Sequence, residues 1–461
     1  MKEIKKFKFK VLYKCNETSA RVSSLFLSNK VDLPIFMPVA TYGAMRCVPV
    51  KFLQNFNKNE GSPLDCQIIL SNTYHLRDIN KNVKNFMNFK NSLLTDSGGF
   101  QIQSLPCKIT DEGVEFIKIK ESDKEKSLDG RRCIRNEDSG EEIKRQKMSE
   151  GGSNNINNSI NSNNSINSNI NSSNTIFTPE DSMTIQAILS PDIIMQLDDV
   201  VNPMNPKNDH QIAVHRSIKW LDRAIIKLEE ISNSKNTNLI FYFNNSYHAL
   251  FPIIQGGLHK DLRELSASLI LKKNPFGLAI GGLCGGESKI DFIQTIKSTV
   301  QFLRSQKYEG PVYVMGVGYP EDVVACCAVG TDMSDCVYPT RTARIGKIFT
   351  DNGDISIKNA TKGTFKDVQR DKNDKLKVFT GCDCNFCQYS LDYLLHIKDT
   401  PNFCTLSSLH NLKYMQNLTK RIRENVKKGS FYKFMVEYFN KRHPFKKPEW
   451  INLLLKPGFF N

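Results

Sequence analysis

The residues best suited to chemistry fall between positions 331 and 346, TDMSDCVYPTRTARIG, where a carboxylate precedes two guanidinium groups. Asp335 lies inside a short apolar run, and Arg341 and Arg344 follow it. A carboxylate buried at a strand end costs free energy unless it has a partner or a task. Arginine side chains suit a phosphate or a planar base. The pattern therefore predicts either an ion pair at a strand end or a functional carboxylate beside a bound nucleotide.

A second group of reactive residues is a set of cysteines near the C-terminus. Cys382, Cys384 and Cys387 form a CxCxxC motif, and His410 lies further along the chain. Three thiolates and one imidazole complete a tetrahedral Zn²⁺ shell, which leaves no open position for water. We therefore predict a structural zinc site, with Cys404 as a competitor for the place of His410.

The elements that must position Asp335 are short apolar runs, each of which ends in polar residues or glycine. They are LPIFMPVA (33–40), QIILSNTYHL (67–76), LLTDSGGFQIQSL (93–105), PDIIMQLDDVV (191–201), FPIIQGG (251–257), FGLAIGGLCGGES (276–288) and PVYVMGVGYPED (311–322). Wholly apolar strands separated by amphipathic helices are typical of a parallel sheet buried on both faces. Polar residues at the strand ends indicate an active-site face, and roughly eight such strands favour a (β/α)8 TIM barrel. No GxGxxG or Walker loop is present, which disfavours nucleotide-cofactor folds.

The composition limits the class of protein. Among 461 residues, 63 Lys and Arg exceed 48 Asp and Glu, for a net charge of +15. This excess suggests a polyanionic partner, nucleic acid first, although basic loops also serve solubility. No signal peptide and no apolar run of the ~18 residues that a membrane helix needs is found. We expect a soluble, cytoplasmic protein whose 13 cysteines are reduced thiols or metal ligands.

The chain divides into four predicted regions. Residues 1–118 are the first part of the barrel, and 119–175, rich in charge and then in Asn and Ser, are a disordered low-complexity insertion. Residues 176–350 complete the barrel with the active site, opening on the helix start TPED at 178–181. Residues 351–461 hold the zinc-binding subdomain and C-terminal helices.

The C-terminal helices combine an apolar stripe with a basic face. Helical spacing predicts core positions for Phe431, Phe434, Met435, Tyr438 and Phe439. The lysines opposite are either a solvated face or a footprint for backbone phosphates.

From about residue 8 to 455, outside the insertion, the chain resembles the tRNA-guanine transglycosylase family, and within it the eukaryotic, queuine-inserting type. The motifs that carry the resemblance are SNTYHL, LTDSGGFQ, DIIMQLDD, IIQGG, AIGGL, VMGVG, DCVYPTRTAR and CxCxxC followed by His. The resemblance implies a (β/α)8 barrel with an inserted zinc-binding subdomain. It also implies exchange of guanine for queuine at wobble position 34 of tRNAs with GUN anticodons.

By the same resemblance, Asp335 is the nucleophile that forms a covalent ribosyl ester, and Asp96 is the general acid and base. Two carboxylates that flank one glycosidic bond follow the logic of retaining glycosidases. Asp332 competes for the role of nucleophile, but the motif favours Asp335. Ser334 stands where the family usually has Phe.

The resemblance also implies binding residues. The base pocket comprises Asp96, Ser97, Gly98, Gly99, Phe100, Asp198, Gln255 and Gly282. The RNA-binding residues are Gly316, Val317, Gly318, Tyr319, Pro320, Glu321, Asp322, Thr340, Arg341, Thr342, Ala343 and Arg344. The target nucleotide must leave its stack to reach the nucleophile.

Two small positions bear on the choice of base. Bacterial relatives, which use a smaller precursor base, have Cys where this chain has Val200 and a bulky residue at Gly285. Glycine there leaves room for the cyclopentenediol of queuine and favours that base.

The implied partners are tRNA, queuine, guanine and an accessory subunit in a heterodimer, with a homodimer as an alternative. Peripheral association with the mitochondrial outer membrane is compatible with the cytoplasmic expectation. Three other functions compete: a non-catalytic accessory subunit, an archaeal-type enzyme that modifies another tRNA position, and a metal-dependent barrel hydrolase. The presence of both predicted catalytic aspartates disfavours the accessory subunit. The end of the sequence soon after Trp450 disfavours the archaeal-type enzyme, and the closed metal shell disfavours the hydrolase.

Overall fold

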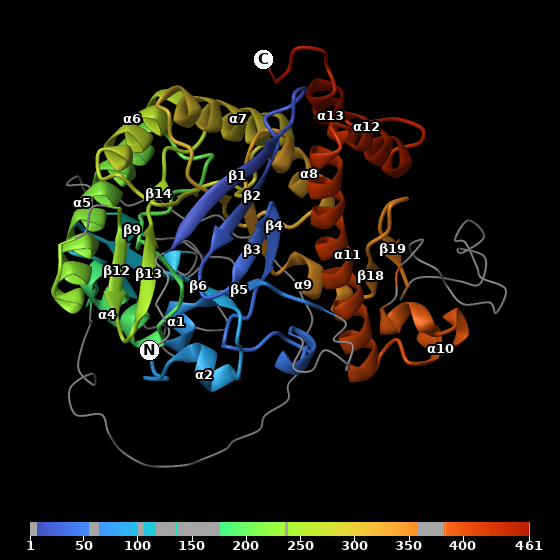
Figure 1. Cartoon of the computed structure of the whole chain (residues 1–461), viewed down its shortest axis with the longest axis horizontal. Helices are drawn as coiled ribbons and strands as arrows, with labels where there is room; N and C mark the ends of the chain where they lie inside the picture. Colours follow the sequence, from blue (N-terminus) through green and yellow to red (C-terminus); the bar gives the residue numbers. More distant parts are fainter. Residues whose placement is uncertain are drawn as a thin grey trace, which may run out of the picture. The chain divides into compact units, whose positions relative to one another are not determined.

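A computed structural model describes residues 7–54, 64–99, 106–116, 134–135, 176–235, 238–357, 382 and 384–460 (Figure 1). The chain divides into two compact units, Met1–Gln101 with Pro179–Asn461, and Ile102–Thr178. The elements of the first unit are β1 (Lys8–Lys14), β2 (Arg21–Phe26), β3 (Lys30–Leu33), β4 (Ile35–Pro38), the 3-10 helix η1 (Val50–Phe52), β5 (Ile68–Asn72), α1 (Thr73–Leu76), α2 (Val83–Met87), β6 (Ser92–Asp96), α4 (Pro179–Leu189), β11 (Ile193–Met195), α5 (Lys207–Ser232), β12 (Ile240–Phe243), β13 (Ser246–Phe251), β14 (Ile253–Ile254), α6 (Lys260–Leu271), β15 (Leu278–Ile280), α7 (Lys289–Ser305), β16 (Val312–Val314), α8 (Pro320–Ala328), β17 (Met333–Cys336), α9 (Tyr338–Arg344), β18 (Lys347–Ile348), β19 (Ile355–Ser356), the 3-10 helix η3 (Asn385–Gln388), α10 (Leu391–His396), α11 (Pro401–Lys427), α12 (Phe431–Arg442) and α13 (Glu449–Leu454).

Two five-stranded sheets, both mainly parallel, form the centre of this unit. In one sheet β5, β6, β11 and β13 run parallel, and β12 pairs antiparallel with β13 at the edge. In the other, β14, β15, β16, β17 and β4 run parallel. A parallel bridge joins Val39 to Leu70, and only Pro252 separates β13 from β14. The apolar runs of the sequence therefore form parallel strands, as predicted, in an α/β fold.

Strands β11, β15 and β16 are apolar throughout because both of their faces are buried. In β11, Ile193 and Met195 belong to an apolar cluster built mainly from strand residues. Ile194, which points to the opposite face, packs into a larger cluster that includes residues of α5, α7 and α8. Continuous hydrophobicity along a strand is the expected signature of this double burial.

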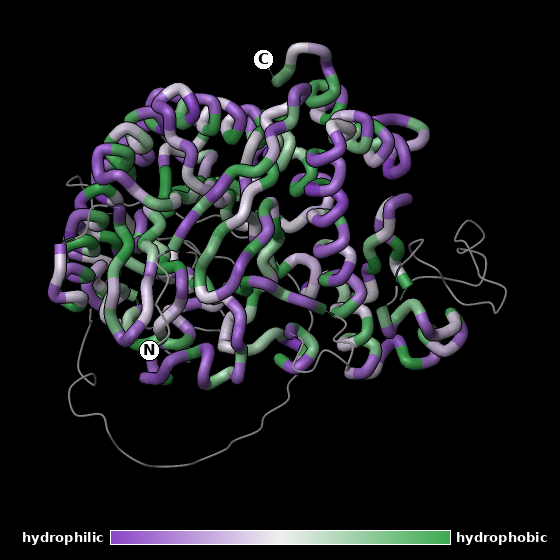
Figure 2. The backbone as a smooth tube through the Cα atoms, viewed as in Figure 1, coloured by the Kyte–Doolittle hydropathy of each residue, from purple (hydrophilic) through white to green (hydrophobic). Residues whose placement is uncertain are grey.

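Helices α5, α6 and α7 lie along the outside of the strands (Figure 1). Their tubes alternate between purple and green in Figure 2, as expected of helices with one face in the core. Helix α4 begins at Pro179 with Glu180 and Asp181 in its first turn, which confirms the predicted helix start. No helix in the described part of the chain is both long and apolar enough to cross a membrane.

The C-terminal helices continue the same unit. Helix α11 packs against α9, the helix that follows Asp335. In α12 the side chains of Phe431, Met435, Tyr438 and Phe439 are buried, as predicted, whereas Phe434 is only partly buried.

The second unit contains β7 (Cys107–Ile109), β8 (Val114–Phe116), β9 (Ile134–Arg135) and β10 (Ile176–Phe177). β8 pairs antiparallel with β7 and β10, and β9 pairs parallel with β7. Residues 102–118 thus belong to this unit, although the sequence analysis assigned them to the first part of the barrel. Of the predicted insertion, 119–175, only Ile134 and Arg135 are described, and the rest lies outside the described residues.

Candidate active site

Four polar side chains gather where parallel strands end. Asp96 ends β6 and Asp335 lies near the end of β17, while Asp198 and Gln255 follow β11 and β14. Parallel strands bring their carboxyl ends to one edge of a sheet, so these residues should meet there. Asp96 interacts electrostatically with both Asp335 and Asp198, which places the three carboxylates close together.

The carboxylate of Asp335 is held by two donors on one oxygen. The hydroxyl of Tyr313 and the backbone N–H of Gly316, the latter at 2.9 Å, both donate to Oδ1. Among the described residues no donor contacts Oδ2. Burial raises the pKa of Asp335, and the two donors partly oppose that rise because they favour the charged form. One oxygen is oriented and the other is available to react.

Asp96 is a buried carboxylate with a pKa near neutrality. Asn72 donates from Nδ2 to Asp96 Oδ2 at 2.8 Å, and the N–H of Gly98 lies 3.3 Å from the same oxygen. Burial and the nearby charge of Asp335 raise the pKa of Asp96 to about 6. A group with this pKa can both give and take a proton at neutral pH.

Asp198 and Gln255 form a buried pair beside Asp96. Gln255 donates from Nε2 to Asp198 Oδ2. Burial above all, with a contribution from Asp96, raises the pKa of Asp198 to about 7. Two glycines allow this close approach, because a Cβ on Gly99 would lie 2.8 Å from Asp198 Oδ1 and one on Gly282 would collide with Gln255 Oε1.

Asp332, the alternative candidate for the nucleophile, has both carboxylate oxygens bound by structural hydrogen bonds. Arg21 donates from Nε to Asp332 Oδ1 at 2.9 Å and from Nη2 to Oδ2 at 2.6 Å. The backbone N–H of Val312 adds a bond of 2.8 Å to Oδ2. Asp332 is buried beneath these donors, so neither oxygen is available to attack a sugar.

Two further side chains shape the site and were not singled out from the sequence. They are Asn72, which holds Asp96, and Tyr313, which holds Asp335. A signal existed for each. Asn72 ends the apolar strand β5. Tyr313 lies in a fully buried strand, where a hydroxyl requires a partner.

The predicted RNA-binding segments are only partly accessible. The exposed or half-exposed members are Gly316, Tyr319, Glu321, Arg341 and Arg344. The buried members are Val317, Gly318, Pro320, Asp322, Thr340, Thr342 and Ala343. The buried members therefore shape the segments instead of presenting side chains to a large ligand.

An aromatic pair lies beside these segments. The rings of Tyr319 and Tyr338 have their centroids 4.0 Å apart, and Tyr319 is 49% exposed. Lys347 Nζ donates to the Tyr338 hydroxyl at 2.9 Å. An exposed tyrosine next to cationic groups is a suitable platform for an unstacked base.

The remaining predicted pocket residues are placed as follows. Ser97 is buried directly after Asp96, and Phe100 lies outside the described residues. Val200 approaches Gly99, so it borders the base pocket. A Cβ on Gly285 would lie 2.5 Å from Pro203 Cδ, so any side chain there would displace the neighbouring turn.

The four predicted metal ligands come together. Their ligand atoms, the Sγ of Cys382, Cys384 and Cys387 and a ring nitrogen of His410, all lie within 4.8 Å of one another. His410 Nδ1 faces the thiols, because Nε2 lies 3.0 Å from the carbonyl oxygen of Phe349. Three thiols and one oriented imidazole fit a closed tetrahedral metal shell. Cys404 instead lies near the carbonyl of Arg344, so His410 is the better fourth ligand.

Parallel strands with three carboxylates at their carboxyl ends, in a chain that also carries a Cys3His cluster, define the class of this protein as an α/β enzyme. A family model described as queuine tRNA-ribosyltransferase matches residues 15–139 and 136–444. The chain therefore belongs to the queuine tRNA-ribosyltransferase family, as its sequence motifs indicated.

Individual relatives support the assignment along nearly the whole chain. The queuine tRNA-ribosyltransferase catalytic subunit of Schizosaccharomyces pombe is 33% identical over 453 residues, 94% of this chain and 91% of that protein. The catalytic subunit of Caenorhabditis elegans is 33% identical over 433 residues, 91% and 87% of the two chains. The queuine tRNA-ribosyltransferase of Buchnera aphidicola is 31% identical over 448 residues, 94% and 98% of the two chains.

Proposed function

We propose that this chain is a tRNA-guanine transglycosylase that exchanges guanine for queuine at wobble position 34 of tRNAs with GUN anticodons. The observation that carries the proposal is the pairing of Asp335, with one oriented and one available oxygen, with Asp96, whose pKa is about 6. Membership of the family supports the same reaction.

The proposed reaction proceeds through two displacements at the ribose carbon C1′. The carboxylate of Asp335 attacks C1′, the bond from C1′ to N9 of guanine breaks, and a ribosyl ester forms. Asp96 gives a proton to the departing guanine and takes one from incoming queuine. The nitrogen of queuine then attacks C1′ and releases Asp335 as a carboxylate, so the phosphate backbone stays intact.

Recognition of the base is assigned to Asp198 and Gln255. An ionised Asp198 can accept hydrogen bonds from the amino and ring N–H groups of a guanine-like base. The nucleotide would leave its stack and lie near Tyr319, with Arg341 and Arg344 close to the flanking RNA. Val200 and Gly285 are proposed to favour queuine over smaller bases.

The finer architecture is also part of the proposal. The bridge from Val39 to Leu70, and the continuation of β13 into β14 across Pro252, favour closure of the two sheets into a (β/α)8 barrel. The Cys3His cluster is proposed to hold a structural Zn²⁺, which would stabilise the subdomain and take no part in the exchange.

A partner subunit is proposed because the fungal and nematode relatives are named as catalytic subunits. The alternative, in which this chain is the non-catalytic member, is disfavoured by the geometry of Asp335 and Asp96. The test is incubation of the pure chain, with and without a candidate accessory subunit, with tRNA and labelled guanine. Incorporation that depends on Asp335 supports the proposal. Its absence under both conditions, with tRNA still bound, would favour the non-catalytic role.

A further inference from the structure

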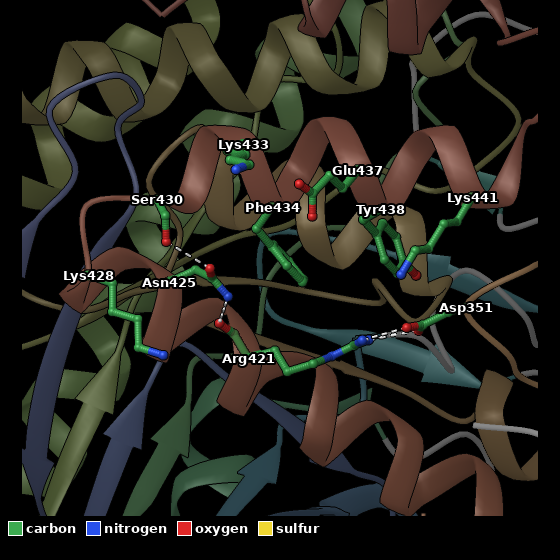
Figure 3. Close-up of a pocket in the computed structure, with 10 residues that line it drawn as sticks. All are labelled: Asp351, Arg421, Asn425, Lys428, Ser430, Lys433, Phe434, Glu437, Tyr438 and Lys441. Atoms are coloured by element: carbon green, nitrogen blue, oxygen red, sulfur yellow. Dashed lines mark hydrogen bonds and ion pairs between the residues drawn. The ribbon is translucent and has the colours of Figure 1, made fainter. Parts of the chain in front are cut away.

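A pocket of about 480 Å³ lies away from the strand ends, between α11, α12 and Asp351. Figure 3 shows Arg421 on α11, Lys428 directly after the end of α11, and Lys433 and Lys441 on α12 arranged around it. No residue assigned to catalysis, base recognition or metal binding lines this pocket. Its function is therefore separate from the chemistry described above.

The pocket has an excess of positive charge, and three exposed lysines line it, one of which, Lys441, also attracts Asp351. Four cationic side chains line it against two carboxylates, Asp351 and Glu437, which leaves a net charge of +2. Arg421 binds Asp351 through two hydrogen bonds of 2.5 and 2.8 Å. By contrast, among the described residues Lys428, Lys433 and Lys441 form no ion pair, and all three are exposed.

The pocket is also built in advance of any ligand. Asn425 Nδ2 donates to the carbonyl of Arg421 at 2.9 Å, and Ser430 Oγ donates to Asn425 Oδ1 at 2.9 Å (Figure 3). Tyr438, at the floor, is buried with its hydroxyl 3.3 Å from that of Tyr414. The lysines therefore project from a fixed frame, which lowers the entropic cost of binding.

A chain of contacts connects this pocket to the surface beside the active site. Arg442, which follows Lys441, donates to Asp354 at 2.7 Å and to Glu321 at 2.9 Å. Asp354 also pairs with Lys347, whose ammonium donates to the Tyr338 hydroxyl. The lysine-rich pocket and the Tyr319–Tyr338 pair are thus anchored to one another through the β18–β19 hairpin.

We propose that this pocket binds backbone phosphates of tRNA at a part of the molecule other than the target nucleotide. This inference rests on the proposed function, which makes a polyanion the substrate. Lysines act as flexible point charges that suit phosphates without reading a sequence. Such contacts would hold the tRNA while one nucleotide is extruded toward Asp335.

The test is a charge reversal of all three lysines in the full chain, Lys428→Glu, Lys433→Glu and Lys441→Glu. Binding of tRNA should weaken by roughly tenfold or more at low salt, and the slope of log K against log salt should fall by about three. The rate of guanine exchange at saturating tRNA should stay within about twofold, because these residues do not touch the reacting atoms.

The matched control reverses three exposed lysines outside the pocket, Lys10, Lys272 and Lys307. A second variant, the glutamine triple Lys428→Gln, Lys433→Gln and Lys441→Gln, removes the three charges without reversing them. Comparison of its thermal stability with that of the wild type excludes misfolding as the cause. If the pocket variants bind tRNA as the control does, or the glutamine triple binds as the wild type does, the proposal is wrong. Wild-type chain that binds tRNA through the pocket but never exchanges guanine would instead refute the proposed function alone.

Discussion

At the scale of single residues, Asp332 and Asp335 are two carboxylates three positions apart in the chain with different surroundings. Asp332 has both oxygens bound by Arg21, whereas Asp335 keeps Oδ2 without a donor among the described residues. Their removal should therefore have opposite consequences for activity and stability.

The first prediction is that Asp335→Asn abolishes base exchange while tRNA binding and the unfolding free energy remain near those of the wild type. Asp332→Asn should instead lower the unfolding free energy by roughly 3–5 kcal/mol, because it breaks a buried ion pair and leaves Arg21 uncompensated. Exchange of labelled guanine and urea unfolding measure the two effects. Near-normal turnover by Asp335→Asn would remove it as the nucleophile.

The second prediction concerns pH and Asp198. Its pKa is about 7 in the folded protein and near 4 in an unfolded chain, so between these values only the folded state holds the proton. Stability should therefore fall as pH rises from about 4 to 7, by up to roughly 1.4 kcal/mol per unit. Asp198→Asn should lose this part of the dependence. Urea unfolding at several pH values compares the two proteins, and parallel curves would contradict the assignment.

At the scale of elements, α11 joins the Cys3His cluster to α9, the helix that follows Asp335. His410 faces the thiols, and the next residue, Asn411, donates to the carbonyls of Pro339 at 3.0 Å and Lys347 at 2.9 Å. Ser407 donates to the carbonyl of Ala343 at 3.1 Å. The Cys3His cluster is thus connected to α9 through a single helix.

The third prediction is that His410→Ala lowers zinc content and thermal stability together, because metal binding at such sites is coupled to folding. The control is Cys404→Ser, which also lies on α11 and should keep both the zinc content and the thermal stability of the wild type. Metal analysis of the purified variants and thermal unfolding measure the effect. Full zinc content in His410→Ala would show that another residue is the fourth ligand.

The sequence predicted elements well where a local pattern decides the structure. Continuous apolar runs predicted β11, β15 and β16, and the spacing of Cys382 to Cys387 predicted the three thiols of the Cys3His cluster. The motif favoured Asp335 over Asp332, but the sequence offered no physical reason for that choice, because the partner of Asp332 is Arg21, far away in the chain. A motif also gives positions without orientation, so it did not show that Gly318 and Thr342 are buried.

At the scale of the whole molecule, the fourth prediction is that residues 136–174 can be replaced by a short linker. The segment is mostly Asn, Ser and charged residues and carries no motif residue. Ile134 and Arg135 should be kept because they pair with β7. Exchange should stay within a few-fold, since loop closure costs change only slowly with length. A folded deletion variant that loses exchange would mean that the segment contacts tRNA or a partner.

The Asp198–Gln255 pair has a consequence for the heat of ligand binding. With a pKa of about 7, Asp198 is roughly half protonated at neutral pH, yet only its ionised form can accept hydrogen bonds on both oxygens from the amino and ring N–H groups of a base. A free base that binds at pH 7 should therefore release roughly half a proton to the solution. Calorimetric enthalpies for guanine should then vary with the ionisation enthalpy of the buffer, and Asp198→Asn should remove that variation. The number of protons released would therefore measure how much of the predicted base pocket is occupied.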